Sequence, residues 1–325
     1  MKKKIAILFG VGLSALIILF FLGPTAKIDP QLKRFILPQD LDQYLQQSEA
    51  RFSDIVPGAE KTIIWANAAK TRTPLSIVYL HGYSATRQET APLSDQVAAR
   101  LGANLVYTRL TGHGRGGMAM AEPTVNDWLN DAVEALAIGK RLGDKVIIIG
   151  TSTGGTLATW LAEQPNTEAV MAYVLISPNY APKEVLSELL AWPWGEQLAA
   201  LLVGPEFSWT PANELQARYW TCRYPLKGLV PMMGLVKFVR ESRLENIRTP
   251  ALVIYSPHDT VINVKKVEQA YARFGSPMKA IKRITHNVNH TNHVLAGDIL
   301  APGNTALVAK LILDFVSQLE TQAGN

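Results

Sequence analysis

A serine between two glycines, in the stretch Gly150-Thr151-Ser152-Thr153-Gly154, is the feature whose residue types point most directly to chemistry. It follows a short apolar run rich in β-branched residues and precedes a helix-compatible segment, as in a turn from a buried strand into a helix. In such a turn a Cβ at Gly150 or Gly154 would collide with the neighbouring strand or helix. The turn would present the Ser152 hydroxyl beside free helix N–H groups that can stabilise an oxyanion. Ser152 is therefore the candidate nucleophile.

Asp259 is the candidate acid of the same site. A serine is a weak nucleophile near neutral pH, so it needs a base, and the base needs an acid to orient it. The apolar run that begins at Ala251 predicts a buried strand, and the polar loop after it carries Asp259. This loop would follow the strand at the same sheet edge as Ser152.

Three histidines follow the next predicted strand and compete for the role of base: His286, His290 and His293. We favour His293, because Val294 and Leu295 can pack beneath a base at a loop–helix boundary. His290 is the alternative, and His286 is interpreted as an ordinary loop residue. The three histidines have no cysteine nearby and do not form a helical H-E-x-x-H pattern, so we do not predict a metal site. We predict no organic cofactor either.

The loop His81-Gly82-Tyr83, after an upstream strand, would complete the site. Gly82 lets the backbone approach a substrate closely, so the N–H of Tyr83 can be the first oxyanion donor. The second donor would be the N–H of Thr153, directly after the nucleophile. Gly82 and His81 are also candidate substrate contacts, although His81 is interpreted as structural rather than as the base.

Alternating strands and helices position these residues. The alternation covers residues 61–178 and 249–325, which predicts an α/β fold with a mostly parallel central sheet and helices on both faces. Residues 179–248 break it and are interpreted as a cap, or lid. Trp192 and Trp194 in this insertion are candidate substrate-binding residues of an acyl-chain pocket. The alternative is that the aromatic residues form the small core of the cap itself.

Taken together, these motifs resemble the α/β-hydrolases, in the branch that contains monoacylglycerol lipases, bacterial carboxylesterases and serine-aminopeptidase-like hydrolases. The matching residues are His81-Gly82, Gly112-His113-Gly114-Arg115-Gly116, Gly150 to Gly155, Pro257-His258-Asp259 and His293-Val294. The resemblance extends from about Thr62 to Leu319. It implies an α/β-hydrolase fold with a helical cap and serine hydrolase chemistry, and it says much less about the substrate.

The first 26 residues differ in kind from the rest. Lys2 to Lys4 precede Ile5 to Leu22, an uncharged run near the short end of what spans a bilayer. Because Gly23 to Ala26 is not an A-x-A cleavage pattern, we favour a single-span signal anchor over a cleaved signal peptide with secretion. Lysines that stay cytoplasmic would put the catalytic domain on the extracytoplasmic (periplasmic) side, with residues 27–60 as a juxtamembrane segment.

The amino-acid composition and net charge limit the class of protein further. Apolar residues make up 48% of the chain and charged residues 18%, which suits a globular enzyme. The net charge of +5 includes the three N-terminal lysines, and no basic block indicates a nucleic-acid partner. The leading hypothesis is a membrane-anchored serine hydrolase that cleaves lipid-derived or other acyl esters through Ser152, His293 and Asp259. Amide or peptide hydrolysis and acyl transfer stay open, and a non-catalytic binding protein is the remaining alternative.

Overall fold

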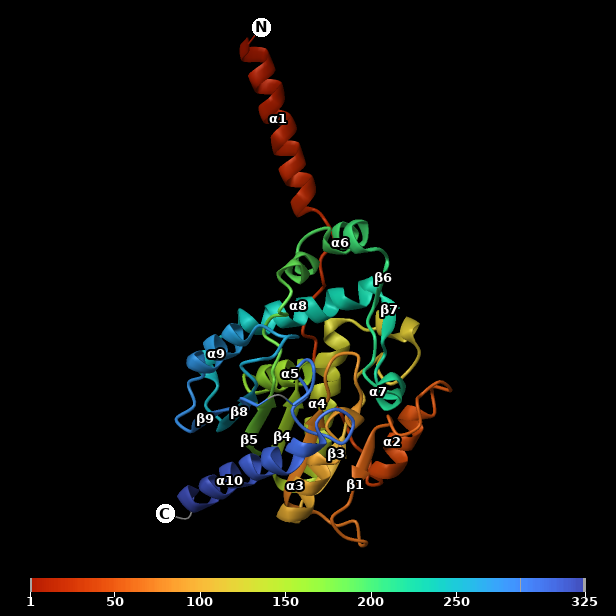
Figure 1. Ribbon diagram of the computed structural model, residues 1–325, viewed down its shortest axis with the longest axis vertical. Coiled ribbons are helices and arrows are strands. Elements are labelled where there is room, and N and C mark those ends of the chain that lie inside the picture. Colours follow the sequence, from red (N-terminus) through yellow and green to blue (C-terminus); the bar gives the residue numbers. More distant parts are fainter. Residues whose placement is uncertain (1, 287, 324–325) are drawn as a thin grey trace.

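A seven-stranded sheet forms the centre of the molecule (Figure 1). The computed structural model describes residues 2–286 and 288–323. The strands lie in the order β1-β3-β2-β4-β5-β8-β9, and all neighbours are parallel except β1 and β3. Their bounds are β1 Thr62–Ile64, β2 Thr73–Leu80, β3 Asn104–Tyr107, β4 Gly143–Thr151, β5 Val170–Ile176, β8 Ala251–Tyr255 and β9 Lys279–Arg283. The predicted mostly parallel sheet is confirmed.

Helices cover both faces of this sheet. Their bounds are α3 Leu93–Leu101, α4 Val125–Leu142, α5 Thr153–Leu161, α9 Val264–Arg273 and α10 Thr305–Ala323. Helices α4 and α5 pack with one set of strand residues, and α3 and α10 with the other. Successive residues of β4 alternate between the two sets, with Ile148 in the first and Ile147 and Ile149 in the second. Because both faces are covered, the strand reads in the sequence as a continuous apolar run.

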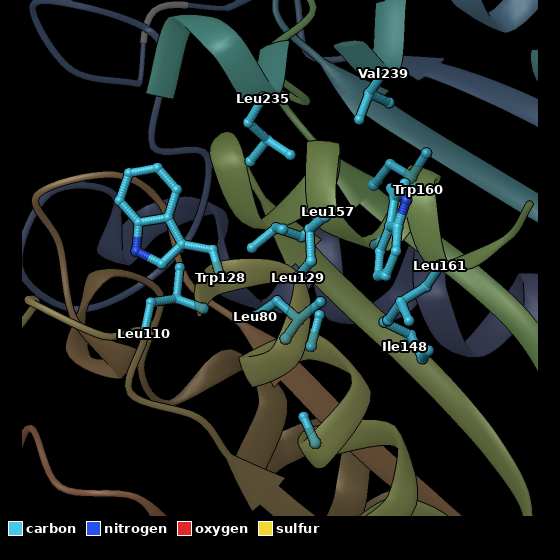
Figure 2. Close-up of a cluster of buried hydrophobic side chains, with 14 of the residues drawn as sticks. Leu80, Leu110, Trp128, Leu129, Ile148, Leu157, Trp160, Leu161, Leu235 and Val239 are labelled. Atoms are coloured by element: carbon cyan, nitrogen blue, oxygen red, sulfur yellow. The ribbon is translucent and has the colours of Figure 1, made fainter. Parts of the chain in front are cut away.

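The core on the α4 and α5 face extends to a long helix of the insertion, α8 (Leu229–Arg240). Figure 2 shows Trp128 of α4 and Trp160 of α5 in this cluster, with Leu235 and Val239 of α8 above them. Leu235 and Val239 are fully buried. Burying such side chains stabilises the fold by about 1.5–3 kcal/mol each. Helix α8 therefore anchors the insertion to the core.

The rest of the insertion is mostly helical. Its elements are η3 Val185–Ala191, α6 Gly195–Val203, β6 Glu206–Ser208, α7 Glu214–Tyr219 and β7 Arg223–Pro225. The guanidinium of Arg240 on α8 donates to both carboxylate oxygens of Glu188 on η3, at 2.6 and 3.0 Å. Strands β6 and β7 pair antiparallel, a feature that the sequence did not predict. The boundaries 179–248 of a separate cap stay a prediction.

The predicted membrane span at the N-terminus is wrong. In residues 2–286 and 288–323, no helix has the length and apolar character needed to cross a membrane. Helix α1 covers Lys2–Phe21. The single-pass anchoring and the extracytoplasmic location rested on this span and are withdrawn with it.

Helix α2 (Leu41–Glu49) attaches the segment 27–60 to the core. The Arg109 guanidinium donates two hydrogen bonds to the Glu49 carboxylate, at 2.7 and 2.9 Å, and both side chains are buried. Arg109 also donates to the carbonyl of His113 at 3.0 Å. The His113 ring packs against that of His81, with centroids 5.1 Å apart. The segment is thus linked, through Arg109 and His113, to the loop that contains His81 and Gly82.

Candidate active site

Ser152 occupies a strained turn between β4 and α5. Its backbone has φ 53° and ψ −116°, a conformation that residues with a Cβ rarely adopt. A Cβ on Gly150 would overlap the backbone of Gly154, and a Cβ on Gly154 would overlap the carbonyl of Leu80 on β2. The predicted need for both glycines is therefore confirmed. The turn holds a nucleophile-type serine, 8% exposed, at the start of a helix.

His293 connects Ser152 with Asp259. Its Nε2 lies 2.9 Å from Ser152 Oγ, and its Nδ1 lies 2.7 Å from Asp259 Oδ2. The other oxygen of Asp259 accepts the N–H groups of Val261 at 2.8 Å and Ile262 at 3.1 Å. These two N–H groups fix the carboxylate in its loop after β8 and leave Oδ2 to face the ring. Three residues from three different strand-end loops thus form one hydrogen-bonded chain.

The other two histidines of the 286–293 stretch lie elsewhere. His286 Nε2 is 2.6 Å from Oδ1 of Asn304. His290 is exposed. The carbonyl of His293, by contrast, accepts a hydrogen bond from the Ser177 hydroxyl at 2.8 Å, which holds its loop against the end of β5. The structure therefore brings His293, and not the alternative His290, to Ser152.

The electrostatic surroundings of His293 favour its protonated form. Burial acts to lower the pKa of the imidazole, but the Asp259 carboxylate, with a smaller contribution from Glu89, raises that pKa above its ordinary value. A ring of this kind accepts a proton more readily than a free histidine does. This is the property that a general base requires.

Two backbone N–H groups are the candidate oxyanion donors: one directly follows Ser152 in the chain and the other directly follows Gly82. They belong to Thr153, the first residue of α5, and to Tyr83 in the loop after β2. Neither has a hydrogen-bond acceptor among the residues that the structure describes. Gly82 itself lies close to the nucleophile, because a Cβ added to it would come within 3.2 Å of the Cβ of Ser152. This closeness explains why the loop needs a glycine at position 82.

The remaining sequence candidates differ in their surroundings. His81 is fully buried; its Nε2 accepts the N–H of Leu110 at 3.0 Å, so its Nδ1 donates to the carbonyl of Gly82 at 2.9 Å. His81 therefore stabilises the loop at Gly82 through its hydrogen bond to the Gly82 carbonyl. Trp192 is half exposed, and the indole N–H of Trp194 donates to the carbonyl of Leu19 in α1 at 3.1 Å. Contact of either tryptophan with a substrate stays a prediction.

Sequence reasoning missed Glu89, a buried carboxyl group next to the loop at Gly82. Its Oε1 accepts the N–H of Gly82 at 2.6 Å. Burial raises the pKa of Glu89 to about 7, even though the N–H of Gly82 and the hydroxyl of Tyr79 act to lower it. The residue lies in a short polar turn, η1 (Arg87–Glu89). A polar turn without periodicity gives no signal that one of its carboxylates is buried.

Known proteins resemble this chain in sequence. The family described as serine aminopeptidase, S33, matches residues 72–293 of this chain. The thermostable monoacylglycerol lipase of Bacillus sp. (strain H-257) is 24% identical over 217 residues, which are 66% of this chain and 82% of that protein.

Solved structures agree in fold. A structure of the metagenome-derived lipolytic enzymes LipS and LipT has a TM-score of 0.63 at 24% identity, covering 81% of this chain and 99% of that one. The monoacylglycerol lipase of Paleococcus ferrophilus has a TM-score of 0.55 at 15% identity, covering 79% and 99%. At these identities the likeness establishes the shared arrangement of sheet and helices.

Proposed function

The chain belongs to the serine aminopeptidase, S33, family of α/β-hydrolases, and we propose that it cleaves carboxylic esters of lipid-derived or other acyl groups. The observation that carries the proposal is the hydrogen-bonded chain from Ser152 through His293 to Asp259. A serine, a histidine and an aspartate joined in this order are the components of acyl transfer through a covalent intermediate.

In the first step, Ser152 Oγ attacks the ester carbonyl and transfers its proton to His293 Nε2, 2.9 Å away. The Nδ1–H of His293 donates to Asp259 Oδ2 at 2.7 Å, which keeps the ring in the required tautomer and stabilises the imidazolium. The pKa of His293, raised above its ordinary value, matches this role as proton acceptor.

The charge that develops on the carbonyl oxygen is stabilised by the N–H groups of Tyr83 and Thr153. Both donors are backbone groups, so they need no rearrangement when the oxyanion forms. The tetrahedral intermediate collapses, and the alcohol leaves with the proton from His293. Water then attacks the acyl-enzyme with His293 again acting as base, which releases the acid and restores Ser152.

The ester preference rests on the similarity to a monoacylglycerol lipase and to lipolytic enzymes. The family description, serine aminopeptidase, makes amide hydrolysis the second candidate. Both reactions use the same acyl-enzyme. Parallel assays with p-nitrophenyl esters of increasing acyl length and with aminoacyl p-nitroanilides separate the two.

Labelling of the full chain with a fluorophosphonate probe tests the mechanism. Ser152→Ala should abolish labelling and ester hydrolysis, and His293→Ala should reduce both by several orders of magnitude. The matched controls are the exposed Ser208→Ala and His290→Ala, which should behave as wild type. Labelling that survives in Ser152→Ala would contradict the assignment of the nucleophile.

A further inference from the structure

Glu89 is a buried carboxyl group beside the candidate site that the steps above do not use. The residue is 2% exposed. A carboxyl group withdrawn from water costs free energy unless hydrogen bonds compensate for the lost solvent. Burial raises its pKa to about 7, so the compensation is only partial. The hydrogen bonds that Glu89 does make therefore point to its role.

One oxygen of Glu89 connects the loop at Gly82 with the turn at the nucleophile. Its Oε1 accepts the N–H of Gly82 at 2.6 Å and the hydroxyl of Tyr79 at 2.8 Å. The same Tyr79 hydroxyl lies 3.1 Å from Oγ1 of Thr151, the residue before Ser152. The loop at Gly82 and the turn at Ser152 are thus joined through the carboxylate of Glu89 and the phenol of Tyr79.

Gly82 fills the space between Glu89 and the nucleophile. A Cβ added to Gly82 would lie 2.9 Å from Glu89 Oε2 and 3.2 Å from the Cβ of Ser152. The backbone at this position is therefore in close contact on both sides. A displacement of the Glu89 side chain would therefore remove one of the contacts that keep Gly82 close to Ser152.

The direction of the Tyr83 N–H follows from how Gly82 is held. The carbonyl of Gly82 accepts hydrogen bonds from His81 Nδ1 at 2.9 Å and from the N–H of Ala85 at 3.3 Å. Because a trans peptide is planar, the N–H of Tyr83 points opposite to this carbonyl. With its own N–H bound to Glu89, Gly82 is fixed at both ends, and so is the donor direction of Tyr83.

We propose that Glu89 is a positioning residue that directs the Tyr83 N–H toward the oxyanion. The inference rests on the proposed function, because it assigns Glu89 to the transition state of that reaction. A donor that meets the oxyanion only in the transition state affects kcat and leaves KM nearly unchanged. The role depends on an acceptor at the place of Oε1 and not on its negative charge.

Three substitutions of Glu89 separate geometry from charge. Glu89→Gln keeps an acceptor oxygen at the same reach, so kcat should stay within about threefold of wild type. Glu89→Asp keeps the charge but withdraws the acceptor, so kcat should fall roughly 10-fold. Glu89→Ala removes the acceptor, and a displaced donor of this kind lowers kcat by roughly 100-fold. KM for a p-nitrophenyl ester should change by less than about threefold throughout.

Inhibition by butylboronic acid gives a second measurement, since its adduct with Ser152 places an oxygen where the oxyanion forms. Its Ki should rise across the series in parallel with the fall in kcat. The control is Glu134→Gln, a buried carboxylate on α4 that hydrogen-bonds Tyr44 and Lys61. This variant should lower the thermal midpoint while kcat stays at the wild-type value.

The outcomes distinguish this inference from the function on which it rests. Wild-type protein without esterase activity would overturn the proposed function and the inference with it. In an active wild type, Glu89→Asp outperforming Glu89→Gln would assign the effect to charge on His293 and overturn the positioning role. Unchanged kcat and Ki in a folded Glu89→Ala would overturn it as well. If Glu89→Ala does not fold, the order of the Gln and Asp variants decides.

Discussion

At the scale of single residues, the two oxygens of the Asp259 carboxylate have different partners. Oδ1 is bound by the N–H groups of Val261 and Ile262, and Oδ2 faces Nδ1 of His293. The backbone therefore sets the direction in which the carboxylate acts. In the proposed mechanism this direction decides which nitrogen of His293 carries the proton and which one faces Ser152.

Asp259→Asn tests this arrangement. An asparagine amide turned toward Nδ1 would donate a hydrogen bond and stabilise the wrong tautomer of His293. We expect kcat for a p-nitrophenyl ester to fall by roughly 10⁴-fold with the fold intact. The exposed Asp298→Asn is the matched control and should keep wild-type kcat. A fall of less than tenfold in Asp259→Asn would contradict the assigned role.

The pH dependence of hydrolysis tests the state of His293. The base must be neutral to accept the serine proton, and the pKa of His293 is raised above its ordinary value, near 6.5. Activity should therefore rise with pH, and the midpoint of this acid limb should lie above about 6.5. The measurement is kcat/KM between pH 5 and 9, with Glu89→Gln as a companion because Glu89 titrates near 7. A midpoint well below 6 in both proteins would contradict the expectation.

At the scale of elements, local signals account for what the sequence predicted correctly. The turn at Ser152 was predictable because its glycines and the apolar run before it are neighbours in the sequence. Glu89 and the pairing of β6 with β7 were not. Glu89 acts through tertiary contacts, and strands of three residues carry no periodicity. The prediction at the N-terminus rested on an uncharged run alone, and the structure overturned it.

The packing of α5 against β2 can be tested at Gly154. A Cβ at this position would overlap the carbonyl of Leu80, so either the helix or the strand must shift. We expect Gly154→Ala to lower the free energy of unfolding by about 1–3 kcal/mol or more. Urea denaturation measures the change. A Cβ on Gly303 would meet no described heavy atom within 4 Å, so Gly303→Ala is the control. Equal stability of the two variants would contradict the argument.

At the scale of the whole molecule, the Glu49–Arg109 ion pair joins the segment before the sheet to the core. Both partners are buried, so loss of Glu49 would leave an uncompensated guanidinium in the interior. Glu49→Ala should therefore lower the free energy of unfolding by about 3–5 kcal/mol. The exposed pair Lys237–Glu241 is the contrast, because Glu241→Ala should change the same quantity by less than about 1 kcal/mol. A small effect of Glu49→Ala would mean that solvent reaches Arg109.

The residues of the candidate site are far apart in the sequence, and this separation determines at which stage of folding the site can form. Ser152 and His293 are 141 residues apart, and the insertion lies between them. Their contact closes a very long loop, and such contacts form late when a chain folds. During refolding from urea, burial of Trp128 and Trp160 should precede the return of fluorophosphonate labelling. The nucleophile would be inert in every partly folded species, so a newly made chain would acquire its reactivity only at the last step of assembly.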